Sequence, residues 1–370
     1  MIRVLQFGMS DNYGGIEAFI MNYYRAADRT KLQFDFAKSD RNIKLAYEEE
    51  ILELGGKIYY TPAIGLKSGY HALSRAWQDF YKGIEVDQIH FNTVALMNLY
   101  AVRFAKLAGY HVHVHAHSSV YDSEFSWWIK TRIAYNRKAV HRYADTLLAC
   151  SDDAGRWMFG TGYKVVPNSI DCGKFQFDER IREEIRGKYR LDDSFVMLHT
   201  GRLSVVKNQM FLLRVLEEVK KRKPNAKLIL VGLDVLNGGI QKAAKEMGLE
   251  GDVVFTGMVK NPEIFYSASD IFLFPSLSEG FGMAPIEAQA NGLRVIVSDR
   301  LVDAINITGT LRYLPICDNN CESASELWAL EIIRNHERLK REEAEQVRMA
   351  YDIHATVKKL EDLYLKYERI

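Results

Sequence analysis

The chain has 370 residues, of which 48% are hydrophobic and 26% are charged, and its formal net charge is +1. That length exceeds one ordinary core and favours two domains, each able to bury its own hydrophobic residues. The near-neutral charge argues against wholesale nucleic-acid binding, and no apolar run approaches the ~20 residues that span a bilayer. We therefore expect a soluble or peripheral protein.

Two further features bear on the cellular compartment. No basic segment followed by an apolar segment opens the chain, so no signal peptide is expected. The cysteines contain no C-x2-C pair and are expected to be free thiols of a cytoplasmic protein, although the last two could meet: Cys150, Cys172, Cys317 and Cys321.

The first half of the chain alternates predicted strands with helical patterns. It opens with a strand over residues 3–8, a polar loop containing Gly14 and Gly15, and a helix over residues 16–27. Further strands are expected over residues 32–37, 57–60, 88–91, 111–116 and 146–149. A glycine pair after a first strand is a common tight turn, and it also lets a ligand approach the backbone closely.

The second half repeats this style. Strands are expected over residues 196–200, 227–232, 253–256, 271–275 and 295–298, and the chain is helical after about residue 322. A final apolar stripe has helical spacing: Ile353, Val357, Leu360, Tyr364 and Tyr367. Alternating strands and helices predict two doubly wound domains with parallel sheets, joined by a hinge within residues 160–178. Ligands are expected at the carboxyl ends of the strands.

Four histidines alternate along the strand over residues 111–116 and just beyond it, so they lie on one face: His111, His113, His115 and His117. Such a pattern can ligate zinc. No obvious carboxylate partner motif accompanies it, and parallel strands of this kind are usually buried on both faces. Buried, hydrogen-bonded histidines are therefore the favoured interpretation.

Residues 128–143 form an amphipathic helical pattern with one basic face. That face carries Lys130, Arg137, Lys138, His141 and Arg142. Together with the neighbouring Trp127, it could rest on anionic lipid headgroups. The alternative is a solvated helix face over an ordinary core.

Two cations follow the strand over residues 196–200 in the segment Gly201-Arg-Leu-Ser-Val-Val-Lys-Asn208, and a helix begins near Asn208. Arg202 can bind two anionic oxygens with its planar guanidinium, while Lys207 supplies a point charge. Both suit the stabilisation of a departing diphosphate. From spacing alone, solvated surface charges are the favoured explanation, and only the wider pattern of the chain reverses that preference.

The segment over residues 276–292 carries the strongest functional signal. Glu279 lies in a glycine-containing turn after a buried strand, and Glu287 lies about one turn inside the helix over residues 283–290. The turn exposes backbone N–H groups at the positive end of the helix dipole, which favours an anion. The two carboxylates would repel that anion, so they more plausibly accept hydrogen bonds from sugar and ribose hydroxyls. A nucleotide-sugar combines both features.

These segments, in this order, resemble retaining glycosyltransferases of the GT-B architecture, specifically glycosyltransferase family 4. The resemblance rests on the Gly14-Gly15 loop, His115-Ala-His117-Ser-Ser, Val166-Pro-Asn-Ser-Ile-Asp171, the loop over residues 201–208 and the E-x7-E spacing of the two glutamates. Ser169 stands where glycine is more usual, Leu293-Arg294 where Leu-Pro is common, and residues 298–308 match more loosely. The resemblance implies an acceptor-side Rossmann-like domain over residues 1–165 and a donor-binding domain over residues 166–350. A terminal helix over residues 351–370 would cross back to the first domain.

The resemblance also assigns roles. Glu279 would contact donor-sugar hydroxyls, Glu287 the ribose, and His117 the donor sugar near its 6-hydroxyl. The catalytic set is then Glu279, His117, Arg202 and Lys207. The donor-binding set is Gly14, Gly15, Arg202, Lys207, Val259, Glu279, Phe281, Gly282 and Glu287, in which Phe281 and Gly282 offer backbone N–H groups and Val259 lies where the base is held.

The expected function is retaining transfer of a hexose or N-acetylhexosamine from a nucleotide-sugar, probably a UDP-sugar, to a glycan or lipid-linked oligosaccharide. The resemblance is closest to exopolysaccharide and capsule enzymes. No metal or other cofactor is expected, because Arg202, Lys207 and the helix terminus replace it. A nucleotide-sugar epimerase on the same fold and a non-catalytic glycan-binding module are the alternatives. A dinucleotide-dependent dehydrogenase is disfavoured, since no G-x-G-x-x-G with a following acid is present.

Overall fold

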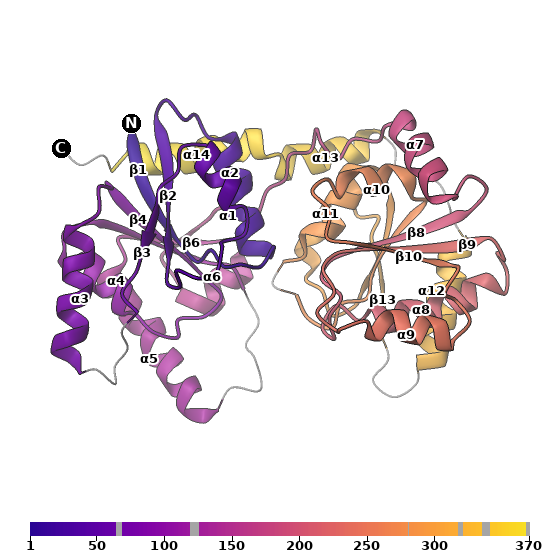
Figure 1. The fold of residues 1–370 in the computed structure, drawn as a ribbon, viewed down its shortest axis with the longest axis horizontal. Coiled ribbons are helices and arrows are strands. Elements are labelled where there is room, and N and C mark those ends of the chain that lie inside the picture. Colours follow the sequence, from indigo (N-terminus) through magenta and orange to yellow (C-terminus); the bar gives the residue numbers. More distant parts are fainter. Residues whose placement is uncertain (64–68, 119–125, 280, 317–320, 335–340, 368–370) are drawn as a thin grey trace. The chain divides into compact units, whose positions relative to one another are not determined.

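The computed structural model describes the whole chain except residues 64–68, 119–125, 280, 317–320, 335–340 and 368–370 (Figure 1). It divides into two compact units. The first unit contains residues 1–169 and 353–370, and the second contains residues 170–352. The divisions fall a few residues from the boundaries expected from the sequence. Each unit is described by itself.

The first unit is built on a seven-stranded sheet in the order β3-β2-β1-β4-β5-β6-β7, with every paired strand parallel. Its strands are β1 Ile2–Phe7, β2 Leu32–Lys38, β3 Ile58–Tyr60, β4 Gln88–Thr93, β5 His111–Ala116, β6 Thr146–Ala149 and β7 Tyr163–Val165. Its helices are α1 Gly15–Ala26, α2 Glu48–Glu53, α3 Tyr70–Lys82, α4 Tyr100–Leu107, α5 Trp127–Tyr143, α6 Asp152–Phe159 and α14 Ile353–Leu365.

The last helix, α14, packs on the first unit beside α1. It does so with the apolar stripe read from the sequence, because Ile353, Val357, Leu360 and Tyr364 are all buried in one cluster with residues of β1, β2 and α1. Tyr367 is partly buried against the same cluster. The spacing of the stripe at about 3.6 residues therefore translates into one buried helix face.

The second unit has a six-stranded parallel sheet in the order β10-β9-β8-β11-β12-β13. Its strands are β8 Phe195–Thr200, β9 Ala226–Val231, β10 Val253–Gly257, β11 Ile271–Phe274, β12 Arg294–Ser298 and β13 Arg312–Leu314. Its helices are α7 Glu179–Tyr189, α8 Gln209–Lys220, α9 Gly239–Glu246, α10 Glu263–Ala268, α11 Met283–Ala290, the 3-10 turn η2 Asp303–Ile305, α12 Cys321–Arg334 and α13 Arg341–Tyr351.

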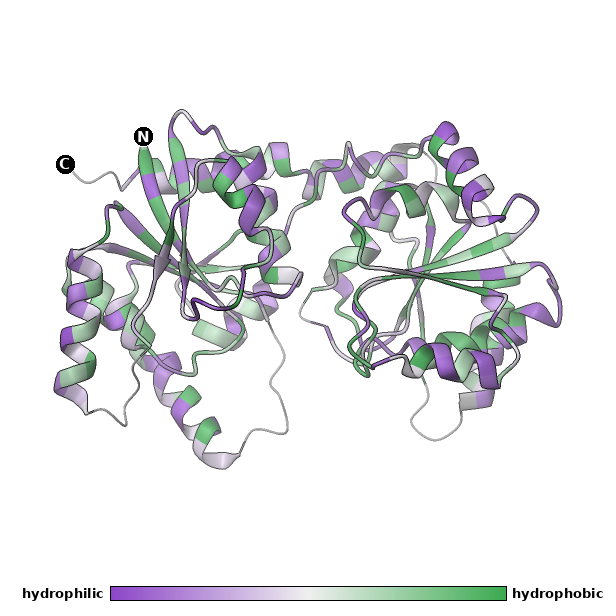
Figure 2. Cartoon of the chain, viewed as in Figure 1, coloured by the Kyte–Doolittle hydropathy of each residue, from purple (hydrophilic) through white to green (hydrophobic). Residues whose placement is uncertain are grey.

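The strands of the second unit are apolar on both faces, as a sheet covered by helices on both sides requires. Val196, Met197 and Leu198 in β8 are fully buried, and alternate residues enter two separate hydrophobic clusters. Figure 2 shows this contrast as strands that are mainly green and surface helices, such as α3 and α9, that alternate green with purple. The predicted pair of doubly wound parallel sheets is confirmed.

The short edge strands β7 and β13 were not predicted. Each has three residues and is largely exposed or half-buried, so neither carries an apolar run that periodicity could detect. Two predicted free thiols, Cys150 and Cys172, are unpaired and buried. Cys317 and the side chain of Cys321 lie outside the part of the chain that the structure describes.

Each sheet has one position where the strand order reverses. In the first unit, β1 pairs with both β2 and β4, and in the second unit β8 pairs with both β9 and β11. In doubly wound sheets, ligands bind beyond the carboxyl ends of the strands at such positions. The loops that follow β8 and β11 carry Arg202, Lys207 and Glu279, so three predicted site residues share this edge of the second unit.

Candidate active site

The loop from β8 to α8 is held in a fixed shape by a second loop beside it. Gly201 and Gly232 end β8 and β9 with φ angles of +146° each, and the backbones approach so closely that a Cβ on Gly232 would lie 2.1 Å from the Gly201 carbonyl oxygen. Beyond them, the Leu203 N–H donates to the Leu233 carbonyl at 2.8 Å. Only glycine fits this crossing, which leads the backbone out of the sheet toward Arg202 and Lys207.

The buried side chains of Gln209 and His199 hold the same loop in place through hydrogen bonds. The Gln209 amide nitrogen donates to the Arg202 carbonyl at 2.8 Å and contacts His199 Nε2 at 3.1 Å, and its oxygen accepts from the Ser204 N–H. His199 Nδ1 in turn contacts the Leu273 carbonyl at 2.9 Å. Burial lowers the pKa of His199 to about 3, so the ring is neutral, donates from Nδ1 and accepts at Nε2. Gln209 and His199 therefore hold the backbone of this loop without using the side chain of Arg202 or of Lys207.

Lys207 and Glu279 form an ion pair across the two loops. Lys207 Nζ lies 2.6 Å from Glu279 Oε1, and the side chains are only 21% and 15% exposed. The hydroxyl of the fully buried Ser276 donates to the same carboxylate oxygen at 2.5 Å. The ammonium also lies 4.7 Å from the centre of the Phe274 ring. A partly buried pair of this kind is better fixed than an exposed one, because less water competes for either partner.

Arg202 differs from Lys207 in having an exposed side chain. Within the ranges that the structure describes, its guanidinium has no hydrogen bond or ion pair, although its carbonyl is held by Gln209. The backbone of Arg202 is therefore fixed in position, whereas no described residue neutralises the charge of its side chain. Arg202 and Lys207 thus bring a free guanidinium and a partly buried ammonium to one loop, and both groups can bind the oxygens of a diphosphate.

Glu287 is held from inside the unit by a short chain of hydroxyl groups. The hydroxyl of the fully buried Tyr266 donates to Glu287 Oε2 at 2.5 Å and lies 2.7 Å from Thr200 Oγ1 at the end of β8. Burial is the main cause that raises the pKa of Glu287 to about 7, with a smaller contribution from Glu263, whereas the Tyr266 hydrogen bond and the charge of Lys207 act in the opposite direction. The described contacts leave Oε1 available for a ligand.

The beginning of α11 supplies backbone donors at the same edge. Gly282 caps the helix with φ +78°, and the N–H groups of Phe281 and Gly282 have no acceptor among the residues that the structure describes. The Phe281 side chain is buried against Tyr351, which anchors the turn. Val259 follows β10 and is partly buried against the hydrophobic cluster that also contains Phe281. The intervening Gly280 of the motif lies outside the described residues.

In the first unit, the predicted Gly14-Gly15 loop is organised by a buried acid. Glu17 accepts from the Ser10 N–H and hydroxyl through Oε1 and from the Gly14 N–H through Oε2. A Cβ on Gly14 would lie 2.7 Å from Glu17 Oε2, whereas a Cβ on Gly15 would meet nothing within 4 Å. A side chain at the first glycine would therefore crowd the Glu17 carboxylate, whereas the second glycine faces open space at the start of α1.

His117 lies at the end of a buried polar network rather than at an open surface. Its side chain is buried, and Nε2 lies 2.9 Å from Asn92 Oδ1. Asn92 donates to Gln6, and Gln6 donates to Tyr364 of α14. Burial lowers the pKa of His117 to about 3. The ring is thus neutral, and Asn92 Oδ1 fixes the proton on Nε2 because the Asn92 amide nitrogen is already used.

The neighbouring histidines of the predicted face are packed against one another. His115 stacks on His117 at 4.2 Å between ring centres, and His113 contacts the Gln88 amide oxygen at 2.8 Å. Burial lowers the pKa of both histidines. Across the described parts of the chain, no group of three His, Cys, Asp or Glu side chains is arranged to hold a metal ion. The expectation of buried, hydrogen-bonded histidines holds for His113 and His117, whereas His111 is only half-buried and neither ring nitrogen of the buried His115 has a hydrogen-bond partner among the described residues.

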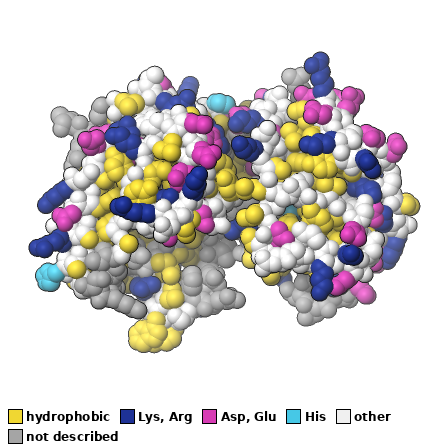
Figure 3. Space-filling model, in the orientation of Figure 1, with side chains coloured by type: hydrophobic (Ala, Val, Ile, Leu, Met, Phe, Trp, Pro, Cys, Tyr) yellow, Lys and Arg dark blue, Asp and Glu magenta, His cyan; other side chains and the backbone are white. Residues whose placement is uncertain are grey.

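The predicted basic helix is α5, and both of its tryptophans are exposed. Trp127 and Trp128 stack on each other with 3.6 Å between ring centres, at the end of α5 that carries a hydrophobic patch in Figure 3. Two side chains of the basic face make hydrogen bonds within the protein. Arg137 Nε donates to the Met158 carbonyl, and His141 Nε2 contacts the Phe159 carbonyl. Among the described residues, no helix combines the length and the apolar composition that spanning a bilayer requires.

Several supporting residues escaped prediction. Ser276 lies three positions before Glu279, Gln209 follows the Lys-Asn pair, and Glu17 follows the glycine pair, so short spacing could have found these three. Tyr266 and Thr200 could not be found in this way, because they meet Glu287 only through the packing of β8, α10 and α11.

Comparison with known proteins agrees with this geometry. The family model described as "Glycosyl transferases group 1" matches residues 181–303. EpsF of Bacillus subtilis (strain 168), which is named as a glycosyltransferase, is 32% identical over 312 residues, covering 82% of this chain and 81% of EpsF.

Solved structures show the same fold at lower identity. HepE of Anabaena in complex with UDP superposes with a TM-score of 0.78 at 16% identity, covering 99% of this chain and 100% of HepE. Its complex with UDP-glucose gives a TM-score of 0.77 at 18% identity, with the same coverage. The two parallel Rossmann-like sheets are thus those of a GT-B fold, and the relationship to EpsF places the chain by sequence. The chain belongs to the glycosyl transferases group 1, enzymes that transfer a sugar from a nucleotide-sugar.

Proposed function

We propose that this enzyme transfers a hexose or N-acetylhexosamine from a UDP-sugar to a hydroxyl of a glycan or lipid-linked oligosaccharide, with retention at the anomeric carbon, in exopolysaccharide or capsule-type synthesis. One observation carries the proposal. Lys207, Glu279 and Glu287 gather at the reversal point of the second sheet, where a cation, two carboxylates and unused backbone N–H groups share one edge. HepE has been solved with UDP and with UDP-glucose, and EpsF is named as a glycosyltransferase.

Each residue has a role in this proposal. Arg202 and Lys207 bind the diphosphate as the glycosidic bond breaks, and Phe281 and Gly282 add backbone N–H donors. Glu287 Oε1 accepts from the ribose, and Glu279 accepts from donor-sugar hydroxyls. Lys207 has three N–H donors, so it can keep Glu279 in place while another of its protons contacts a phosphate oxygen.

The remaining predicted residues complete the donor site. Val259 borders the base, the open space at Gly15 admits the donor close to the backbone of Gly14 and Gly15, and His117 contacts the sugar. No metal ion or other cofactor takes part in this mechanism. Two cations and a helix N-terminus supply the positive charge that a bound metal would supply elsewhere.

Peripheral contact with the inner membrane surface is part of the same proposal. The exposed Trp127-Trp128 pair and the exposed cations of α5, Arg132, Lys138 and Arg142, suit the interface of an anionic bilayer. An acceptor attached to lipid would then reach a protein that rests on the membrane. Sedimentation with phosphatidylglycerol vesicles tests the contact, with Trp127→Ser/Trp128→Ser expected to reduce it and unchanged binding counting against it.

The function is tested by incubating the protein with radiolabelled UDP- and GDP-sugars, with and without short oligosaccharide acceptors. We expect transfer from a UDP-sugar, an α-linked product from an α-linked donor by NMR, and loss of transfer in Lys207→Ala and Glu279→Gln. Isomerisation of the donor without acceptor and without hydrolysis would instead show an epimerase. Binding of glycan with no reaction on any donor would show a non-catalytic module.

A further inference from the structure

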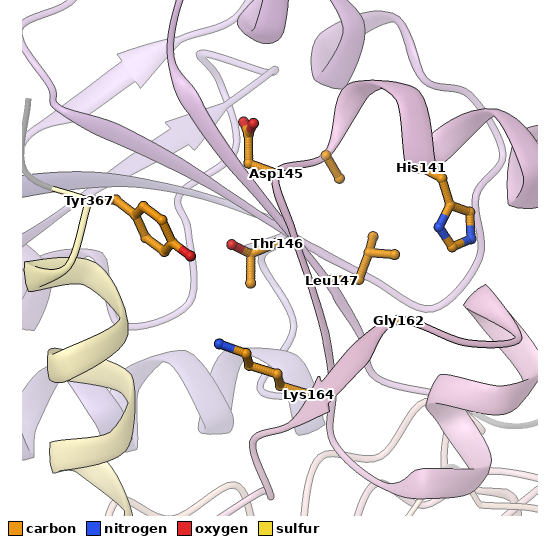
Figure 4. A pocket seen from close by; sticks show the side chains of 8 residues that line it. His141, Asp145, Thr146, Leu147, Gly162, Lys164 and Tyr367 are labelled. Carbon is orange, nitrogen blue, oxygen red and sulfur yellow. The ribbon is translucent and has the colours of Figure 1, made fainter.

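A second candidate binding site lies in the first unit, at the edge of the sheet opposite to the ends of β1 and β5. A pocket of about 260 Å³ opens beside the beginnings of β6 and β7 and the end of the chain's last helix (Figure 4). Its polar lining comes from His141, Asp145, Thr146, Gly162, Lys164 and Tyr367. The proposed transfer reaction uses none of these residues and therefore gives this pocket no role.

The pocket lining includes one carboxylate, Asp145, and one lysine, Lys164. Asp145 is already compensated, because Oδ1 lies 2.5 Å from Lys106 Nζ and Oδ2 accepts from the Val112 N–H at 3.0 Å, and its carboxylate points away from Lys164 in Figure 4. Lys164 is exposed, and in the part of the chain that the structure describes it has no ion pair. One lysine charge is therefore left over to attract an anion.

Hydroxyl groups face the same space. In Figure 4 the Tyr367 hydroxyl points toward Thr146, and the Lys164 ammonium ends in the same space. Thr146 Oγ1 lies 3.1 Å from His111 Nε2, and burial lowers the pKa of His111, so a neutral imidazole can donate to the hydroxyl and leave the threonine proton for a ligand. Among the described residues the Tyr367 hydroxyl has no hydrogen-bond partner.

The wall that carries Tyr367 is preformed. The Tyr367 ring stacks on His111 with 3.9 Å between centres and 21° between planes, and the Gln88 amide nitrogen donates to the Tyr367 carbonyl at 3.0 Å. Little side-chain entropy remains to be lost when a ligand arrives, which favours binding by a small number of contacts.

We infer that this pocket binds a phosphate monoester, held by Lys164, Thr146 and Tyr367 at a site separate from the centre of sugar transfer. A lysine charge with hydroxyl donors from different directions matches a tetrahedral dianion better than a planar carboxylate. The volume admits a phosphate with a small substituent. A neighbouring hollow of about 480 Å³, which shares His141 and includes Lys138 and Phe159, leaves room for the substituent to continue.

Two sources of this group are possible, a free metabolite and a lipid headgroup, and two binding measurements separate them. The first titrates glycerol 3-phosphate into the full-length protein and follows the phosphorus line width by NMR. The second sediments the protein with vesicles containing phosphatidic acid, against vesicles of equal surface charge made with phosphatidylglycerol, whose phosphate is a diester. Saturating UDP is present throughout, so that phosphate binding at the transfer site is blocked.

Lys164→Met is expected to weaken binding by about tenfold or more, as loss of a charged hydrogen bond requires, and Tyr367→Phe by a smaller factor. Lys82→Met, an exposed lysine of the same unit at the end of α3, is the matched control and should bind as the wild type does. Dependence on Lys164 with glycerol 3-phosphate identifies a metabolite site, and dependence with phosphatidic acid alone identifies a lipid headgroup site.

Equal binding by wild type and Lys164→Met in both measurements, or no binding in either, overturns the inference. Circular dichroism of each variant checks that the fold is intact. Sugar transfer from UDP-sugars should persist in Lys164→Met, so failure of this inference and failure of the proposed function give different results.

Discussion

Replacement of Tyr266 by phenylalanine tests how the carboxylate of Glu287 is prepared for the ribose. The substitution removes a hydroxyl that donates to Glu287 Oε2 at 2.5 Å and keeps the buried ring, which packs on Phe175 and Phe272. Burial already raises the pKa of Glu287 to about 7, and the Tyr266 hydrogen bond opposes that rise. Without the hydroxyl, the pKa must increase further.

The size of the effect follows from the hydrogen bond. A hydrogen bond to a charged group contributes about 1.5–3 kcal/mol, and 1.36 kcal/mol corresponds to one pH unit, so the pKa of Glu287 rises by about one to two pH units. At pH 7 the ionised fraction falls from about one half to between about one tenth and one hundredth. Affinity for UDP should fall by about five- to fiftyfold if only the carboxylate accepts from the ribose.

The assay is calorimetric titration of UDP between pH 6 and pH 9. Wild-type affinity should decrease as the pH falls through about 7, and the Tyr266→Phe curve should be displaced to higher pH. Deoxyuridine diphosphate, which lacks one ribose hydroxyl, corrects for titration of the phosphates themselves and should respond less to both pH and the substitution. Coincident pH curves for the two proteins would refute the reasoning, as would displacement to lower pH.

Three further predictions concern the other parts of the structure. Lys207→Ala should weaken UDP binding and reduce transfer by about 100-fold, while UDP binding by the wild type survives EDTA; loss of binding in EDTA would reject the metal-free mechanism. Gly15→Ala should fold normally, because its Cβ meets nothing in the protein, but should transfer more slowly, because the methyl group occupies space proposed for the donor. Gly14→Ala should lower the melting temperature by crowding Glu17, and equal stability of the two variants would contradict this. Five buried histidines have pKa values below the unfolded value of about 6.5, so the unfolded chain binds protons that the folded chain does not, and stability is lost as pH falls below about 6.5: His90, His113, His115, His117 and His199. Urea unfolding should show a loss of about 1.4 kcal/mol for each histidine at pH 5.5, and an unchanged midpoint between pH 7.5 and pH 5.5 would contradict it.

The sequence predicted the framework well because the relevant signals are local. A buried apolar run such as Ile271–Phe274 can scarcely form anything other than an internal strand, and Pro285 in the first turn of α11 indicates where that helix begins. The stripe of α14 could likewise be read at helical spacing. Edge strands as short as β7 have no such signal, since their residues are exposed on an outer strand.

The candidate site could be predicted only in its outline. Arg202, Lys207 and Glu279 follow strand ends, where doubly wound sheets bind ligands, so their positions could be expected. The interactions that these side chains make could not be predicted. Lys207 is paired with Glu279 and Arg202 is unpaired among the described residues, because Ser276 and Gln209 set the two loops through tertiary contacts.

The polar interior of the first sheet shows the same limit. Alternation placed the histidines of β5 on one face, but their partners come from β1, β4 and α14, which are distant in sequence. Burial keeps His117 neutral, and Asn92 determines which ring nitrogen carries the proton, so both properties exist only in the folded unit. Its role toward the donor sugar stays a prediction.

The most direct test of the central claim is a crystal structure of this protein with a non-hydrolysable UDP-sugar. We expect the diphosphate to contact Lys207 Nζ, the Arg202 guanidinium and the N–H groups of Phe281 and Gly282. The ribose should bind to Glu287 Oε1 and the sugar hydroxyls to Glu279. A nucleotide bound elsewhere, with the Lys207–Glu279 pair undisturbed and Arg202 still in solvent, would contradict it.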